Sequence, residues 1–165
     1  MNIALAANYD VNKTWSKTIP CNKSAQGVMS AVQNDMGQFA DNRGTIFSAN
    51  FPDQPITMGG QYVIQPGLNS YNGGQFPGTN LVVTVTAESA NGWTFTTDPS
   101  QHFLNGTVSF SSVDAGSGNV TFSITAQGNW SSNFWALMGP IIKAGENSTW
   151  NNMLNSVQGY CQLAP

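Results

Sequence analysis

The stretch GTVSFSSVDAGSGNVTFSITAQG, residues 106–128, contains two runs in which apolar and polar side chains alternate. Strict alternation predicts a β-strand with one face in the core and the other toward solvent. The glycine-rich DAGSGN between the runs predicts a turn, so the two runs form an antiparallel hairpin. One face of this hairpin carries only apolar residues, namely Val108, Phe110, Val120, Phe122, Ile124 and Ala126.

Two shorter alternating runs precede this hairpin. LVVTVTAES (81–89) and WTFTTD (93–98) flank the short turn ANG, which is typical of a second hairpin. The four runs together predict an antiparallel meander over residues 81–128. Further strands are expected at GTIFSANF (44–51) and QYVIQP (61–66), and a long loop at 67–80.

The C-terminal residues 131–161 have a helical pattern. We expect Gly139-Pro140 and Gly145 to break it into pieces, because both interrupt regular helices. Asn147 or Ser148 can cap the last piece. This piece carries one apolar stripe, formed by Trp150, Met153, Leu154, Val157 and Cys161.

The N-terminal part predicts one helix from Asn22 to Asp41, with Ser24 as its N-cap. Its apolar residues recur at helical spacing, at Val28, Val32, Met36 and Phe39. Residues 1–20 show no clear period and are expected to form an N-terminal arm. The whole chain of 165 residues is therefore predicted to be a single α+β domain, with the meander packed on the C-terminal helix.

The composition restricts the classes of function. Charged residues make up 8% of the chain, against about 25% in ordinary soluble domains. The net charge of −3 and the scattered basic residues argue against nucleic acid as a partner, since phosphate binding needs clustered Lys and Arg. No apolar run approaches the roughly 20 residues of a membrane helix. A surface so poor in charge is typical of exported proteins, so we expect an extracellular or periplasmic location.

Two cysteines, Cys21 and Cys161, fit no zinc or redox spacing. In an exported protein the natural interpretation is a disulfide between them. The alternative is two buried free thiols.

Residues 93–161 resemble the START-like superfamily of lipid-transfer proteins and polyketide cyclases, in which a curved sheet grips a long C-terminal helix. WTFTTDPSQHFLNGTVSFSS (93–112), GSGNVTFSITAQGN (116–129) and the helical end carry the resemblance. It implies a cavity between sheet and helix for an apolar small molecule, used for catalysis by some members and for carriage by others. The chain departs from the pattern in two respects: it lacks an obvious strand before the first helix, and Gly-Pro interrupts the final helix.

Aromatic side chains are the candidate lining of such a cavity. Trp130 and Trp135 lie where the last strand enters the helical segment, which suits a cavity entrance. Ordinary core packing is the alternative for every one of the candidates. The full set of candidate ligand-binding residues is Trp93, Phe95, Phe110, Trp130, Trp135 and Tyr71.

The only histidine is His102, and Asp98 lies four residues before it. A His–Asp pair can fix the imidazole tautomer for general acid–base catalysis. The alternative is a structural loop histidine. Nucleophile-elbow, zinc, calcium and phosphate-loop motifs are missing from the sequence, so we expect no metal and no cofactor.

Three functions remain open on this evidence. The first is a secreted protein that binds an apolar or amphipathic small molecule between sheet and C-terminal helix. The second is an enzyme on the same scaffold that uses His102 as acid–base. The third is a secreted toxin or interaction protein that acts on membranes or glycans, because the 106–128 hairpin also has the alternation of a membrane-inserting hairpin.

Overall fold

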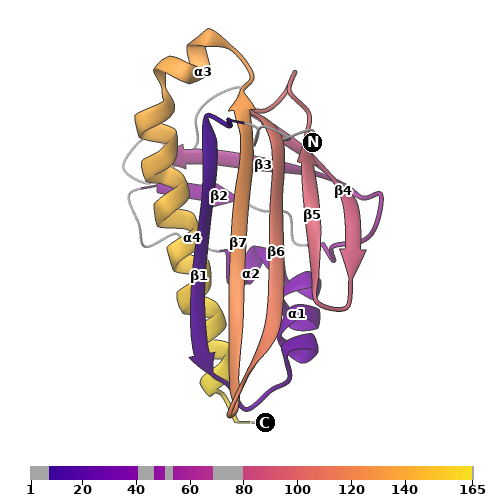
Figure 1. Ribbon diagram of the computed structural model, residues 1–165. Coiled ribbons are helices and arrows are strands. Elements are labelled where there is room, and N and C mark those ends of the chain that lie inside the picture. Colours follow the sequence, from indigo (N-terminus) through magenta and orange to yellow (C-terminus); the bar gives the residue numbers. More distant parts are fainter. Residues whose placement is uncertain (1–7, 41–46, 51–53, 69–79, 165) are drawn as a thin grey trace, which may run out of the picture.

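The computed structural model describes residues 8–40, 47–50, 54–68 and 80–164 (Figure 1). Within these residues the strands form one antiparallel sheet in the order β1-β7-β6-β5-β4-β3-β2. The strands are β1 (Val11–Pro20), β2 (Phe47–Asn50), β3 (Gln61–Leu68), β4 (Leu81–Ser89), β5 (Gly92–Thr97), β6 (Leu104–Gly116) and β7 (Asn119–Trp130). The helices are α1 (Ala25–Asn34), α2 (Met36–Phe39), α3 (Asn133–Leu137) and α4 (Gly139–Gln162).

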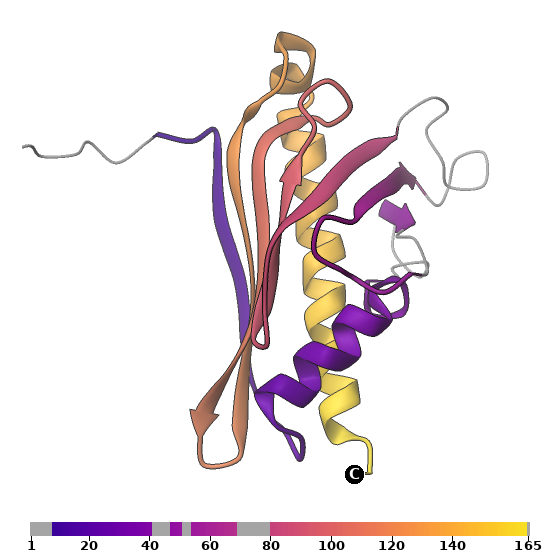
Figure 2. The same cartoon turned by 90° about the vertical axis from the view of Figure 1, so that its right-hand side faces the viewer.

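The predicted antiparallel meander on a C-terminal helix is confirmed. Strands β4 to β7 pair in sequence order, and Phe110 of β6 lies opposite Ile124 of β7. The apolar residues of the two long strands are buried on one face of the sheet, as the alternation predicts. Helices α1 and α4 both lie on this inner face, and α4 runs along the side of the sheet nearest β1 (Figures 1 and 2).

The expectation of an N-terminal arm is wrong for Val11–Pro20. This segment is strand β1, which pairs with β7 along its whole length. Its period is hard to see in the sequence because Lys13 and Lys17 occupy inward positions, between apolar ones. Their ammonium groups donate hydrogen bonds to Asn147 and Gln158 of α4, so they extend along the helix at the sheet edge. The buried residues of β1 are Val11, Trp15 and Ile19.

Helix α4 is continuous through Gly145, so the expected break there and the cap at Asn147 or Ser148 are both wrong. Packing of the apolar stripe against the sheet stabilises the helix beyond its low local propensity. The break at Gly139-Pro140 is confirmed, since α3 ends at Leu137 and α4 begins at Gly139. Proline is compatible with the first turn of a helix, where its missing N–H is not needed. The predicted stripe is buried from Trp150 to Cys161.

The predicted N-terminal helix is divided in two at Asp35. The hydroxyl of Ser24 accepts a hydrogen bond from the N–H of Gly27 at 3.0 Å, which confirms the predicted cap of α1. Val28 and Val32 are buried, as their spacing predicts.

The predicted disulfide is present between Cys21 and Cys161. It joins the end of β1 to the last turn of α4, and so closes the end of the molecule opposite α3. None of the helices in the described part of the chain is long and apolar enough to span a membrane.

Candidate functional site

The inner face of the sheet has large side chains in its middle, and three small residues lie among larger ones toward α3. In mid-sheet, Phe110 and Phe122 are fully buried. Toward α3 the inward positions of β6 and β7 are Val108, Gly106 and Leu104, opposite Ala126, Gly128 and Trp130 respectively, and Val108 and Leu104 are buried. Small residues at three of these positions reduce the side-chain volume between Phe110 in mid-sheet and the Leu104–Trp130 pair at the α3 end.

Gly106 and Gly128 lie opposite each other, and their backbones approach closely. A Cβ atom at Gly106 would lie 2.0 Å from the carbonyl oxygen of Gln127, and one at Gly128 would lie 2.5 Å from that of Asn105. Only glycine fits such an approach. The absence of side chains at this one level of the inner face is thus built into the strand pairing.

Three of the predicted ligand-binding residues come together in mid-sheet. The rings of Trp93 and Phe110 stack with their centroids 4.2 Å apart, and Phe95 meets Phe110 edge-on at 5.7 Å. Trp150 of α4 contacts Phe110 edge-on at 5.5 Å, which closes the cluster from the helix side. All these side chains are buried. They form an aromatic layer between sheet and helix.

Two buried polar atoms, one in this layer and one two residues beyond Phe110 on β6, have no hydrogen-bond partner among the described residues. They are Nε1 of Trp93 and Oγ of Ser112, and both atoms are buried. An unpaired buried donor is unfavourable by about 1–3 kcal/mol, so such atoms commonly bind water or a ligand.

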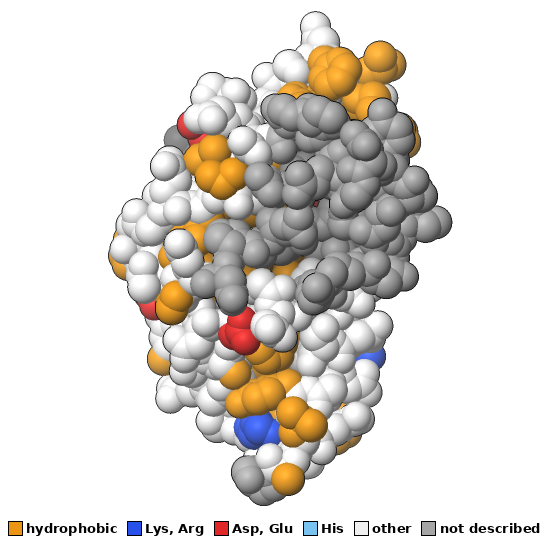
Figure 3. Space-filling view, turned by 180° about the vertical axis from the view of Figure 1, so that it is seen from behind, with side chains coloured by type: hydrophobic (Ala, Val, Ile, Leu, Met, Phe, Trp, Pro, Cys, Tyr) orange, Lys and Arg blue, Asp and Glu red, His pale blue; other side chains and the backbone are white. Residues whose placement is uncertain are grey.

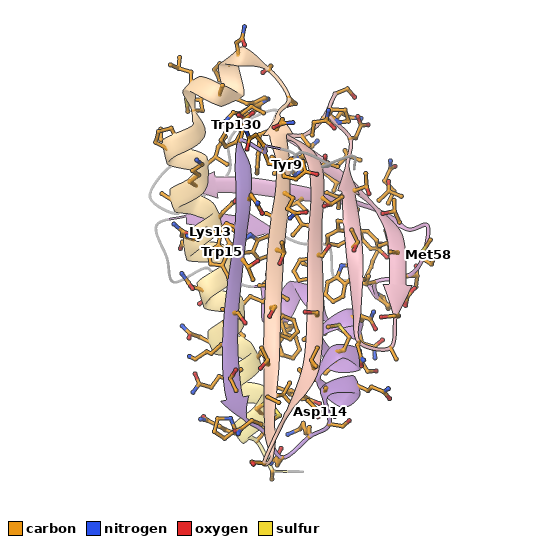
Figure 4. All side chains as sticks on the ribbon, in the orientation of Figure 1. Tyr9, Lys13, Trp15, Met58, Asp114 and Trp130 are labelled. Carbon is orange, nitrogen blue, oxygen red and sulfur yellow. A yellow bond between two sulfur atoms is a disulfide. The ribbon has the colours of Figure 1, made fainter. Side chains whose placement is uncertain are left out.

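Trp130 and Trp135 lie at the α3 end, apart from the mid-sheet cluster (Figure 4 labels Trp130). The Trp130 ring packs on the start of α4, where a Cβ atom at Gly139 would lie 3.0 Å from it. Nζ of Lys143 is 6.0 Å from the centroid of the same ring. Trp135 meets the half-buried Phe103 at 6.1 Å. Tyr71, the remaining predicted ligand-binding residue, lies outside the described residues.

The sequence reasoning missed Glu146, a partly buried carboxyl on α4. It lies one turn before Trp150 and two turns before Met153, so helical spacing places it on the inward stripe. Burial raises the pKa of Glu146 to about 7, although Lys13 and Lys143 partly oppose the shift. The spacing from Trp150 is the sequence signal that identifies it, once α4 is known to be continuous.

The structure directs the hydrogen bonds of His102 and Asp98 to different partners. Nδ1 of the buried His102 accepts the N–H of Leu104 at 2.9 Å, and burial lowers the pKa of His102 to about 4. The Asp98 carboxylate accepts from Ser100, which lowers the pKa of Asp98. The imidazole is therefore neutral at pH 7, and a catalytic role of the pair stays a prediction.

A polar groove between α1 and the β4–β5 turn was not anticipated. It is open to solvent and has a volume of about 580 Å³. Met58 and Glu88 meet on its far side, where the Glu88 carboxylate accepts the N–H of Met58 at 2.9 Å. The lining residues are Gln26, Ser30, Gln33, Met58, Glu88, Ser89 and Ala90.

The hairpin considered for membrane insertion lies inside the sheet. Strand β6 pairs with β5 and β7, and β7 pairs with β1 and β6. Insertion of this hairpin into a membrane would have to break the β5–β6 and β1–β7 pairings. The described residues also contain no cluster of three His, Cys, Asp or Glu side chains that could hold a metal ion.

The sequence matches no protein-family model and has no significant match among curated proteins. Solved structures do resemble the chain. Protein Ms6760 from Mycobacterium smegmatis has a TM-score of 0.61 and 11% identity, with 96% of each chain covered. Protein CV1439 from Chromobacterium violaceum has a TM-score of 0.63 and 11% identity, over 93% of this chain and 99% of that one. Ara h 8.0201 has a TM-score of 0.56 and 12% identity, over 91% of this chain and 96% of that one. At such identities the likeness concerns the fold alone, and it shows that this chain has the helix-grip fold.

Proposed function

We propose that the chain binds an apolar or amphipathic small molecule between the sheet and α4, in the half next to α3. The observation that carries this proposal is the group of small residues Gly106, Ala126 and Gly128, which lies between Phe110 in mid-sheet and Leu104 and Trp130 at the α3 end. On the helix side Gly145 is also small, whereas the Trp130 ring covers Gly139. Small residues on both layers favour an internal space, because a sheet and a helix are held apart by the larger side chains elsewhere.

The groups around this region suit an amphipathic molecule. The aromatic layer of Phe95, Phe110 and Trp150 would form the floor of the site, and Trp130 lies toward its outer end. Glu146 supplies one polar group on the helix side. With a pKa of about 7 its carboxyl is about half protonated at neutral pH, so it can accept or donate a hydrogen bond.

The resemblance to the START-like superfamily supports the same proposal. Strand β1 removes one departure from that pattern, since a strand does precede the first helix. Export is likewise a proposal, supported by the Cys21–Cys161 disulfide and the low content of charged residues. Catalysis at His102 and Asp98 would be recognised by a loss of turnover in His102→Ala with ligand affinity unchanged.

The test is a titration of the oxidised protein with a neutral apolar probe, N-phenyl-1-naphthylamine, which fluoresces in apolar sites. We expect saturable one-to-one binding that is lost on unfolding. Ala126→Phe places a ring in the proposed space and should weaken binding at least tenfold. Thr125→Phe is the matched control, because the neighbouring side chain is on the outer face of the same strand.

Two results would contradict the proposal. One is the absence of saturable binding by the wild-type protein. The other is unchanged binding in Ala126→Phe together with destabilisation by about 1–3 kcal/mol, which is the usual effect of overpacking a filled core.

A further inference from the structure

The α3 end of the molecule exposes three large apolar side chains. Phe134 is 60% exposed, Leu137 is 81% exposed and Ile141 is 49% exposed. Phe134 and Leu137 are three residues apart on α3, and Ile141 follows in the first turn of α4, beyond the break between the two helices. We call them the α3 apolar patch. In Figure 3 hydrophobic side chains gather at this extremity of the molecule.

The segment that carries the α3 apolar patch contains almost no charge. Residues 131–145 include one charged residue, Lys143, and no acidic residue. The ring of Phe134 meets the half-buried Trp135 edge-on at 5.0 Å. Aromatic residues with a single cation, at the tip of a molecule, are typical of segments that enter the headgroup region of a bilayer.

The size of the patch favours a lipid surface over a second copy of the chain. Full burial of a large side chain covers roughly 150–250 Å², so the exposed surface of the three side chains amounts to roughly 300–500 Å². A stable dimer buries about 800 Å² on each partner. Shallow insertion into a bilayer needs no matching protein surface, and a patch of this size is sufficient for it.

We propose that the chain docks on lipid bilayers through its α3 end, by inserting Phe134, Leu137 and Ile141. The net charge of −3 gives no general attraction to anionic lipids, so the apolar effect drives the docking. The inference goes beyond ligand binding between sheet and α4, and does not depend on it. If both proposals hold, the end of the molecule that inserts into the bilayer is also the end next to the proposed binding space.

The test is sedimentation of the full, disulfide-closed chain with phosphatidylcholine vesicles, and with vesicles that also contain phosphatidylglycerol. We expect binding to both, with little dependence on salt, and a blue shift of tryptophan emission as Trp135 enters the interface. Removal of one inserted side chain should lower the partition coefficient about tenfold. The double variant Phe134→Ser/Leu137→Ser should therefore lower it about 100-fold.

The matched control is Met58→Ser/Val113→Ser, which removes two side chains of similar exposure from other parts of the surface. This control should bind vesicles as the wild type does. Circular dichroism checks that both double variants are folded. The probe titration is run on the same proteins, so loss of vesicle binding with probe binding retained separates docking from the ligand site.

Three outcomes would overturn the proposal. The first is absence of wild-type binding to either kind of vesicle. The second is an equal loss of vesicle binding in the control variant. The third is a wild-type dimer in analytical ultracentrifugation that the Phe134→Ser/Leu137→Ser variant lacks, since this would assign the patch to a second copy of the chain.

Discussion

Replacement of Glu146 by Gln should stabilise the protein above neutral pH and leave its stability unchanged near pH 4.5. Burial raises the pKa of this carboxyl from 4.5 to about 7. Between these values the unfolded chain is ionised while the folded protein keeps the proton. The free energy of unfolding therefore falls as pH rises through this interval, and the full penalty is present above pH 7.

The magnitude follows from the size of the shift. Each pKa unit corresponds to 1.36 kcal/mol, so a shift from 4.5 to about 7 sets an upper limit of about 3 kcal/mol. Glu146 keeps part of its surface in solvent, which screens the effect. We therefore expect Glu146→Gln to be more stable than the wild type by about 1.5 kcal/mol at pH 8.

His102 has the opposite effect in nearly the same interval of pH. Burial lowers its pKa from 6.5 to about 4, so the unfolded chain binds a proton that the folded protein does not. This contribution makes the free energy of unfolding fall as pH decreases from 6.5 to 4, by up to about 3 kcal/mol. In the wild type the two pH-dependent contributions to the free energy of unfolding partly cancel. In each single variant the pH dependence caused by the remaining group should therefore become visible.

The assay is urea unfolding at pH 4.5, 5.5, 6.5, 7.5 and 8, at constant ionic strength, followed by tryptophan fluorescence. The quantity compared is the difference in the free energy of unfolding between variant and wild type, in which the contributions of all unaltered groups cancel. For Glu146→Gln it should rise with pH. His102→Asn, which retains an acceptor for the N–H of Leu104, should become less destabilising as pH falls. A difference that is constant from pH 4.5 to 8 would refute the reasoning for that residue.

Three further predictions concern stability. Removal of the disulfide by Cys21→Ala and Cys161→Ala should lower the free energy of unfolding by about 3–5 kcal/mol, because it frees a loop of 140 residues in the unfolded chain; equal urea midpoints before and after substitution would contradict this. Phe110→Ala should lower the free energy of unfolding by about 3–5 kcal/mol, because the contacts with Trp93 and Trp150 are lost. Calorimetry should find a change below about 0.5 kcal/mol for the control Val113→Ala, an exposed position on the same strand. Ser24→Ala should lower the free energy of unfolding by about 1 kcal/mol, and Ser24→Asp should restore most of the loss.

Local patterns predicted much of the fold. The alternation in 106–128 gave two central strands because each inward residue meets an inward residue of its neighbour, as Phe110 meets Ile124. Ser24 was predictable as a cap, because capping involves only nearby backbone groups. The disulfide was predicted because two cysteines without metal or redox spacing, in a composition typical of exported proteins, are expected to pair.

Local patterns failed where distant parts of the chain decide the structure. Strand β1 was predicted as an arm because Lys13 and Lys17 interrupt its apolar face, and only β7 and α4 provide the partners that order it. Gly145 was predicted to end a helix that continues through it. The helix continues because its buried stripe packs on the sheet, which local propensity does not include.

The candidate site divides in the same way. The sequence by itself determined that aromatic residues line the inner face of an antiparallel sheet under a C-terminal helix. Only the tertiary structure decided that Trp93, Phe95 and Phe110 form one layer while Trp130 and Trp135 lie at the α3 end. It alone decided the charge states of His102 and Glu146, because desolvation depends on everything that surrounds a group and spacing along the chain does not specify it.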